Sequence, residues 1–559
     1  MNKTFRKTAL LVGAFSLLGL CYSPDAYAAA SPQEVQQAKK ITGTVVDATG
    51  PVIGASVVVK GTSNGVATDF DGNFSLNANP GQTLVISYIG YLTKEIKITA
   101  AQSKYNVTLE EDKKILDEVV VVGYGTMKKS DISGASATVG ESAIKGSLIT
   151  SLDQALQGHA AGVSAVSTSG APGSGSSIRV RGTATINANA EPLYVIDGVI
   201  VQSQGLTGYD YGLGDALGNG SVSTISPLST IDPQDIVSME ILKDASATAI
   251  YGAQGANGVV LITTKHGKAG EAKFSYSGTI ALNRQTKRLD ILDLREYADY
   301  YNAYVEIGEA TANPIFLDKS LLGKGTNWQD AVFQTALMHQ HQVSAQGGTD
   351  KVRYYVSGSY MKQEGTIIGS EFNRLSARAN VDADLKSWLK MGLNVAFSDS
   401  NDDLKLADGE EGIINYSLTT TPNLPIYDMD GNYASSSYEG SSSPNPIALA
   451  LLNENKLNRQ KLNGNIFFDV KFYKDLTWHT ELGFDLGWSK ADRYRPIISL
   501  ATYHQNNNTA STQKNSNKFW QIKNYVTWTH NFAGKHNVTG MVGQEAWESS
   551  WDYLTQIGR

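Results

Sequence analysis

Residues 476–488 have the sequence Leu-Thr-Trp-His-Thr-Glu-Leu-Gly-Phe-Asp-Leu-Gly-Trp, in which apolar and polar residues alternate. One set of alternate positions holds Leu476, Trp478, Leu482, Phe484, Leu486 and Trp488, and the other holds His479, Glu481 and Asp485. Successive side chains of a β-strand point to opposite faces. The segment therefore predicts a long strand with one apolar and one polar face.

The same alternation recurs along residues 273–559. Its apolar positions are Phe274, Tyr276, Ile280 and Leu282; Val352, Tyr354, Val356 and Tyr360; Met391, Leu393, Val395 and Phe397; and Ile466, Phe468, Val470 and Phe472. A soluble sandwich also alternates, but these segments reach ~10 residues, about twice the usual soluble strand. No later run approaches the ~20 apolar residues of a membrane helix. We therefore expect a mainly β protein whose C-terminal part is a partial antiparallel transmembrane β-barrel.

The N-terminus predicts export. Lys3, Arg6 and Lys7 precede an uncharged apolar run, and small residues follow at Ala26 and Ala28. This pattern is typical of a secretory signal peptide over residues 1–28, with cleavage between Ala28 and Ala29, rather than of a buried first helix. The only cysteine of the chain, Cys21, lies inside it. The mature protein would then contain no disulfide and no thiolate metal site.

Two smaller domains are expected before the barrel. Residues 41–112 contain short apolar runs separated by Gly, Pro, Asn and Asp, which predicts a small β-sandwich. Its Asp69-Phe70-Asp71-Gly72 segment fits a tight hairpin better than a calcium loop. Residues 131–268 are glycine-rich and mix strand and helix signals, which predicts an α/β domain.

A valine run lies in the polar linker at residues 113–130. Val119 to Val122 have high strand propensity but no evident sheet of their own. Such a segment suits β-augmentation, in which a partner protein adds an edge strand. The last strand of the preceding sandwich is an equally good interpretation.

The sequence gives little support for catalysis or for a bound cofactor. It contains no H-E-x-x-H, G-x-S-x-G or P-loop motif, and the net charge of −7 provides no basic field for nucleic acid. His339 and His341 fall on one face of a predicted strand, but no third metal ligand is nearby in the sequence. We expect no enzyme activity, no cofactor and no metal site.

Several motifs together resemble the SusC/RagA-like family of TonB-dependent outer-membrane transporters. Gly43 to Asp47 and Thr68 to Phe74 are similar to the carboxypeptidase regulatory-like domain of this family. Ser177 to Gly182, Pro192 to Val199 and Glu240 to Gly252 are similar to its plug. The TonB box of the family is matched by Asp117, Glu118, Val119, Val120, Val121, Val122, Gly123, Tyr124 and Gly125.

The resemblance implies import across the outer membrane of a Gram-negative cell. A plug would fill the barrel, and TonB, with its inner-membrane motor, would bind the box from the periplasm. A SusD-like lipoprotein would cover the barrel at the cell surface. The cargo would be an oligomeric nutrient, a glycan more than a peptide. A surface binding or adhesion protein without transport is the alternative.

Arg179 and Arg181 are the predicted plug locks. Strand alternation would place both on one face, where each could pair with a carboxylate of the barrel wall. A solvated plug strand is the equally weighted alternative. If the two arginines form a lock, charge reversal at both should loosen the plug.

The barrel is expected to be incomplete. Residues 273–559 accommodate about nine strands of membrane length. A plugged outer-membrane transporter needs roughly 22 strands, whereas ~8 strands enclose only their own side chains. The last residues, Gln556 to Arg559, also lack the terminal aromatic of family barrels. We therefore expect the chain to contain the plug and only part of its barrel.

Overall fold

The computed structural model describes residues 39–558 except 48–49, 53, 63, 89–90, 110–118, 122–125, 129–135, 146–150, 168, 183–189, 202–226, 407–411, 436–442, 501–502 and 533–535. The predicted signal peptide and its Ala28/Ala29 cleavage site therefore lie outside the described residues. The chain divides into two compact units, residues 1–117 and 118–559, which are described separately.

The first unit is the predicted β-sandwich. One sheet has the order β4-β1-β7 and the other the order β3-β2-β5-β6. Their bounds are β1 (Lys39–Val46), β2 (Ser56–Val59), β3 (Gly65–Ala67), β4 (Asn73–Ala78), β5 (Thr83–Ser87), β6 (Lys94–Lys97) and β7 (Lys104–Thr108). Alternate residues of β1, β4 and β5 are buried in one apolar core. The Asp69 carboxylate accepts hydrogen bonds from the backbone N–H groups of Asp71 and Asn73, so this segment is a tight turn.

The second unit begins with a mixed α/β domain, the plug. Its five-stranded sheet has the order β10-β15-β16-β13-β14, beside a separate β11-β12 pair. The strands are β10 (Ser136–Gly140), β11 (Val163–Ser167), β12 (Ser176–Val180), β13 (Leu193–Ile196), β14 (Val199–Val201), β15 (Ile236–Leu242) and β16 (Val259–Thr264). The helical elements are α2 (Glu141–Lys145), η2 (Gln154–Leu156), η4 (Pro227–Thr230), η5 (Pro233–Asp235), α3 (Ala245–Thr248) and η6 (Ala249–Gly255). An apolar core shared by these strands and helical turns holds the domain together.

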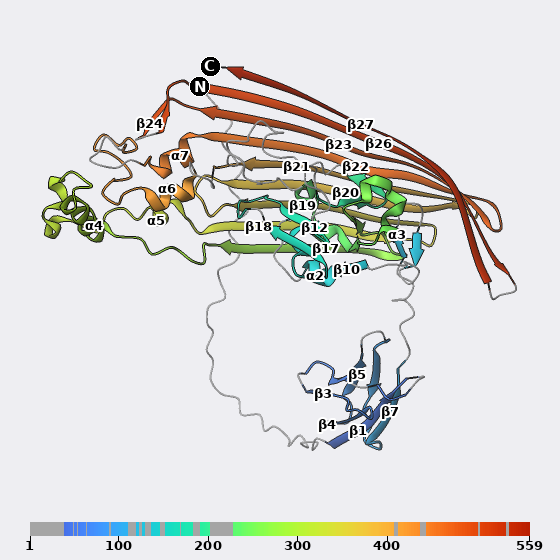
Figure 1. The fold of residues 1–559 in the computed structure, drawn as a ribbon. Coiled ribbons are helices and arrows are strands. Elements are labelled where there is room, and N and C mark those ends of the chain that lie inside the picture. Colours follow the sequence, from blue (N-terminus) through green and yellow to red (C-terminus); the bar gives the residue numbers. More distant parts are fainter. Residues whose placement is uncertain are drawn as a thin grey trace, which may run out of the picture. The chain divides into compact units, whose positions relative to one another are not determined.

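A nine-stranded antiparallel sheet follows the plug in the chain. Figure 1 shows its long strands running side by side. Its order is β17-β18-β19-β20-β21-β22-β23-β26-β27, which confirms the expected nine long strands. The bounds are β17 (Gly270–Asn283), β18 (Ala336–Gly348), β19 (Val352–Glu364), β20 (Glu371–Lys386), β21 (Leu389–Asp403), β22 (Glu454–Tyr473), β23 (Leu476–Arg495), β26 (Thr509–Phe532) and β27 (His536–Gly558). In the described residues the sheet is open, with β17 at one edge and β27 at the other.

The two faces of this sheet differ in polarity. On the outer face Phe274, Ile280 and Leu282 are more than 70% exposed, and Leu482 and Trp488 are also exposed. The inner face faces the plug and buries polar side chains; these include Gln340, Ser357, Arg374, Asn394, Arg459, Glu481 and Lys523. An apolar outside and a polar inside are the reverse of a soluble sandwich and typical of a membrane barrel.

The connections alternate in length along the sheet. Turns such as 349–351, 387–388 and 474–475 are short, whereas residues 284–335 and 404–453 are long. Short turns are periplasmic and long loops extracellular in bacterial outer-membrane barrels, which fixes the orientation. The long connections contain α4 (Leu294–Glu306), η7 (Pro314–Phe316), η8 (Lys319–Leu321), α5 (Trp328–Val332), α6 (Ile413–Thr419) and α7 (Pro446–Leu452), and β24 (Ile498–Leu500) pairs with β25 (Tyr503–Gln505) between β23 and β26. Among the described residues, no helix is long and apolar enough to cross a membrane.

Candidate functional site: the plug–sheet interface

Three buried carboxylates of the plug face the sheet. Asp197 lies in the turn between β13 and β14, where Asp197 and Gly198 both have positive φ, as a two-residue hairpin of this kind requires. Its carboxylate accepts hydrogen bonds from Thr264 N at 2.9 Å and Thr264 Oγ1 at 2.6 Å. Asp232 caps the turn η5 by accepting from Gln234 N at 2.9 Å, and Asp235 ends the same turn. Turn geometry and hydrogen bonds within the plug therefore position these carboxylates independently of the sheet.

Two buried arginines of β20 lie opposite these carboxylates. Arg378 lies 3.7 Å from Asp197 (Nη1 to Oδ2) and 3.5 Å from Asp235 (Nε to Oδ2). Arg374 is fully buried, and its Nη2 lies 4.0 Å from Asp232 Oδ1. Because a buried charge without a counter-charge is very costly, each side of this interface requires the other.

Arg374 also forms hydrogen bonds with the backbone of the plug. Its Nη1 donates to the carbonyl oxygens of Ser229 at 2.7 Å and Ile231 at 2.9 Å. Arg459 of β22 donates to Ser229 Oγ at 3.1 Å and pairs with both oxygens of Asp402 on β21 at 3.0–3.2 Å. The segment from η4 to η5 is therefore held by two arginines of different strands.

Neutral groups complete the shell around Asp235. Its Oδ1 accepts from Gln342 Nε2 at 2.7 Å, Tyr355 Oη at 2.9 Å and Ser357 Oγ at 2.8 Å. Burial and the neighbouring Asp232 raise the pKa of Asp235, while Arg378 and the two hydroxyl donors oppose that rise.

The β13–β14 turn is also anchored to the inner face of the sheet by strands β22 and β26. Gly198 O accepts from Lys523 Nζ at 2.5 Å and from Gln521 Nε2 at 3.1 Å, both on β26. Asp197 O accepts from Asn465 Nδ2 of β22 at 3.0 Å. Phe519 of β26 adds an apolar contact, because it packs in a cluster with β13–β16 residues of the plug.

The segment that joins the plug to β17 is fixed to the periplasmic end of the sheet. Asn380 Nδ2 donates to Lys265 O at 2.7 Å, and His266 Nδ1 lies 2.9 Å from Asp382 Oδ2. A Cβ on Gly267 would lie 2.2 Å from the backbone N of Tyr354, so only glycine fits this approach. Burial alone would lower the pKa of His266, but the Asp382 hydrogen bond and the nearby Asp197 charge raise it overall.

The arginines predicted as plug locks lie elsewhere. Arg181 has φ of +57° and pairs with Asp244, a residue of the plug, because the strand alternation ends at Val180. Arg179 acts electrostatically on another plug residue, Glu191, whose pKa burial raises to about 7 against the opposing charge of Arg179. Among the described residues neither arginine contacts a carboxylate of the sheet, and the pairing with the barrel wall stays a prediction.

Sequence reasoning missed the contacts of the β20 arginines with the plug, although a signal was present. Arg374, Ser376, Arg378 and Asn380 occupy alternate positions of one strand. Two arginines on the inner face of a membrane strand require buried partners. Turn residues of the plug, such as those of Asp232-Pro233-Gln234-Asp235, supply them.

Part of the predicted TonB box is described. Val119 to Val121 form β8 (Val119–Val121), which pairs with β9 (Thr126–Lys128) in an antiparallel hairpin. This strand is in neither sheet of the sandwich and falls in the second compact unit. Asp117, Glu118, Val122, Gly123, Tyr124 and Gly125 lie outside the described residues.

His339 and His341 share one face of β18, as predicted, and that face is the outer one. Tyr276 Oη lies 2.7 Å from His341 Nδ1, and the two imidazole rings have centroids 5.4 Å apart. In the part of the chain that the structure describes, no group of three or more metal-ligating side chains is assembled.

Known proteins share both the domains and the fold. The CarboxypepD_reg-like domain family matches residues 41–121, and the TonB-dependent receptor plug domain family matches residues 128–259. The TonB-dependent receptor SusC of Bacteroides thetaiotaomicron is 37% identical over 84% of this chain and 45% of its own length. The TonB-dependent receptor P3 of Formosa agariphila is 33% identical over 91% of this chain and 48% of its own. A chain of the RagAB peptide importer in its open-open state is 26% identical, with a TM-score of 0.63 over 79% of this chain and 50% of that one.

A plug anchored against an antiparallel sheet of membrane-length strands defines a TonB-dependent receptor of the outer membrane. Within this class the chain belongs to the SusC/RagA-like family. It spans about half the length of the curated relatives it matches. These relatives are receptors and not enzymes.

We expect Arg374 and Arg378 to hold the plug against the sheet, and Arg179 and Arg181 not to contribute. Arg378→Gln leaves Asp197 and Asp235 buried without their cation, which typically costs about 3–5 kcal/mol. We expect this variant to admit a bulky antibiotic that the intact outer membrane excludes. The comparison is the Arg179→Glu/Arg181→Glu double variant, which should leave antibiotic sensitivity unchanged. Equal leakage from the two variants would contradict this assignment.

The His266–Asp382 contact should depend on pH. Because the folded-state pKa of His266 is raised, its stabilisation is complete below the ordinary value of 6.5 and is lost as pH rises through the folded-state value. The difference in Tm between wild type and His266→Gln should therefore be largest near pH 5.5 and smaller at pH 8. A Tm difference independent of pH would show that the imidazole charge does not contribute.

Proposed function

We propose that the protein imports an oligomeric hydrophilic nutrient across the outer membrane, driven by TonB. The observation that carries the proposal is the chemistry of the plug–sheet interface. The plug has its own apolar core, whereas its contacts with the sheet are largely hydrogen bonds and ion pairs. Polar contacts can be exchanged for water when the plug moves, so such an interface suits a plug that must be displaced and return.

The strand β8 supports TonB as the partner. It precedes the plug in the chain and pairs only with the short strand β9 among the described residues. A partner strand could replace β9 or add beside β8 through main-chain hydrogen bonds. Force applied at this point would be transmitted along the chain, past β9, to β10, the first strand of the plug sheet.

The same reasoning extends to the surface partner and the cargo. We infer that a SusD-like lipoprotein covers the long connections, because SusC and the RagAB importer are the relatives that match this chain. We favour a glycan over a peptide as the cargo. The family resemblance of the sequence implies a glycan more than a peptide, and the RagAB peptide importer is 26% identical to this chain.

A surface binding protein without transport is the second candidate function. The long connections favour it, since they expose aromatic and apolar side chains, among them Tyr300, Tyr304, Leu317, Leu321 and Met429. Such a protein would bind its ligand without needing β8. Import requires β8 and surface binding does not, so a variant that lacks β8 distinguishes the two functions.

Loss of the box should abolish uptake and preserve binding. Deletion of residues 117–125 in the intact protein should reduce uptake of labelled oligomer at least tenfold, with surface binding unchanged. Val120→Pro should have a similar effect because proline removes a ladder hydrogen bond, whereas Val120→Ile should behave as wild type. Uptake that survives the deletion would favour the binding protein.

The cargo can be identified by growth. A strain that lacks this protein should fail to grow on at least one oligosaccharide of a panel while growing normally on oligopeptides and on the component monosaccharides. Growth lost only on oligopeptides would replace the glycan assignment by a peptide one, and growth retained on every substrate would argue against import.

A further inference from the structure

The strands β26 and β27 continue well beyond the membrane at their extracellular ends. They contain 24 and 23 residues, whereas a membrane strand needs about 9–11. Because β23 leaves the short periplasmic turn 474–475, its far end and the start of β26 are extracellular. On the outer face of β26, Trp520 is followed toward this end by Lys518, Ser516 and Lys514. The outer face thus becomes polar, as expected where the strands leave the lipid.

The inner face of β27 is aromatic along the same stretch. Trp547 is the ladder partner of Gln521, which donates to the plug from the inner face. Strand alternation places Trp551 and Tyr553 on that face as well. Trp551 is 49% and Tyr553 62% exposed, and their ring centroids lie 5.0 Å apart. Exposed rings on this face are unexpected, because membrane barrels have a polar interior and place aromatic residues at the two lipid interfaces.

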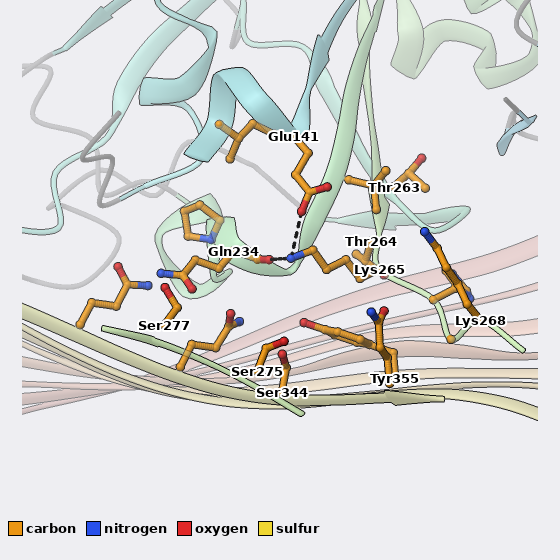
Figure 2. Close-up of a pocket in the computed structure, with 18 of the residues that line it drawn as sticks. Glu141, Gln234, Thr263, Thr264, Lys265, Lys268, Ser275, Ser277, Ser344 and Tyr355 are labelled. Atoms are coloured by element: carbon orange, nitrogen blue, oxygen red, sulfur yellow. Dashed lines mark hydrogen bonds and ion pairs between the residues drawn. The ribbon is translucent and has the colours of Figure 1, made fainter. Parts of the chain in front are cut away.

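The two rings lie beyond the contacts between plug and sheet. Phe519 of β26 packs against the plug, and the ladder partners of the rings, Asn517 and Asn515, lie further toward the extracellular end. The rings therefore line the lumen on the extracellular side of the plug. The cavity of about 850 Å³ between the plug and β17–β19 differs (Figure 2). Its described lining includes one tyrosine, Tyr355, which is only 2% exposed, so that cavity has no open phenol or indole ring.

A row of amide side chains borders the aromatic pair. Asn517 lies opposite Trp551, and Asn515 lies opposite Tyr553. Asn515 Nδ2 donates to Ser489 Oγ at 3.2 Å. The same amide accepts at Oδ1 from Nε2 of the next inner-face residue, Gln513, at 3.0 Å. These hydrogen bonds hold the row in place beside the rings.

The wall next to the pair is open and uncharged. Gly487 of β23 lies opposite Asn517, and a Cβ added at Gly487 would meet only the Asn517 Cβ, at 3.9 Å. Ser489 lies opposite Asn515 in the same way. In these two ladder rows, the described inner-face residues of β23, β26 and β27 carry no charge. A neutral ligand can therefore reach the rings without displacing an ion pair.

A flat aromatic pair bordered by amides suits a sugar ring. One face of a sugar ring carries C–H groups that pack against an aromatic ring, while the hydroxyl groups at its edge need donors and acceptors. Trp and Tyr supply large, rigid apolar surfaces, and each amide supplies both donors and an acceptor. The two rows contain no cation that would attract an anion, and a purely apolar ligand would leave the amides unpaired.

We propose that Trp551 and Tyr553, with Asn515 and Asn517, form a saccharide-binding subsite on the inner wall of the barrel. The proposal rests on the proposed function for the identity of the cargo. One sugar unit stacks on the ring pair, and the amides bind its hydroxyl groups. The cargo is thereby held in the lumen before the plug is displaced.

Loss of the indole tests the subsite by binding alone. The probe is each neutral oligosaccharide of the growth panel, fluorescently labelled and added to the purified intact protein. Trp551→Ala should weaken binding at least tenfold with an unchanged Tm, because the side chain is half-exposed. Trp551→Phe keeps a ring and should bind within threefold of wild type. The matched control, Trp488→Ala, removes an indole that is 40% exposed on the outer face and should bind as wild type does.

Tryptophan fluorescence gives a second readout. Bound oligosaccharide should change the tryptophan emission of the wild-type protein, because the sugar covers the Trp551 ring. The Trp551→Phe variant still binds and should lose most of that change. A change of full size in this variant would place the sugar elsewhere and overturn the proposal.

The outcomes separate the subsite from the proposed function. Equal affinity of Trp551→Ala and wild type would overturn the subsite, and a lowered Tm of that variant would then make the ring pair a structural contact. Weaker binding of oligopeptides only would overturn the saccharide assignment. Wild type that binds an oligosaccharide through Trp551 without importing it would refute the proposed function and leave the subsite standing.

Discussion

The rest of the structure depends on the burial of arginine guanidinium groups on the inner face of the membrane sheet. Arg374 is 0% and Arg378 5% exposed, in a sheet whose other face is apolar. Charges buried in this way are tolerated only beside counter-charges and hydrogen-bond acceptors. Asp197, Asp232 and Asp235 of the plug provide the counter-charges, and backbone oxygens of η4 and the η4–η5 connection provide acceptors. The position of the plug is therefore set by the electrostatics of the sheet.

Within one compact unit, the interior of the plug and the interface between plug and sheet are therefore stabilised by different interactions. Inside the plug, apolar side chains of strands and helical turns form a core that excludes water, so the plug has a hydrophobic core of its own. At the sheet, polar groups meet polar groups, and each contact has water as a competitor once the interface opens. The contacts are also uneven, since cationic side chains cluster on β20, β22 and β26 while amides and hydroxyls line β17–β19.

The sequence predicted the elements better than the contacts between them. Period-two alternation predicted the long strands, because the apolar membrane and the polar interior impose it locally. The site was missed because its partners are far apart, with Arg374 143 residues from Ile231. Alternation placed Arg181 beside Arg179, but positive φ turns the chain at Arg181. The helix α4 was not predicted from the sequence, although Asp293 and Glu296 form a capping box at its start.

The most direct test of the account is the coupling between Asp235 and Arg378. A double-mutant cycle would compare Asp235→Asn, Arg378→Gln and the double variant, with the free energy of plug opening measured by protease protection of the plug in native outer membranes. Residues in direct contact typically couple by about 0.5–3 kcal/mol. The account predicts that the double variant is more stable than the sum of the single effects implies, by at least about 1 kcal/mol. Additive effects of the two substitutions would contradict it.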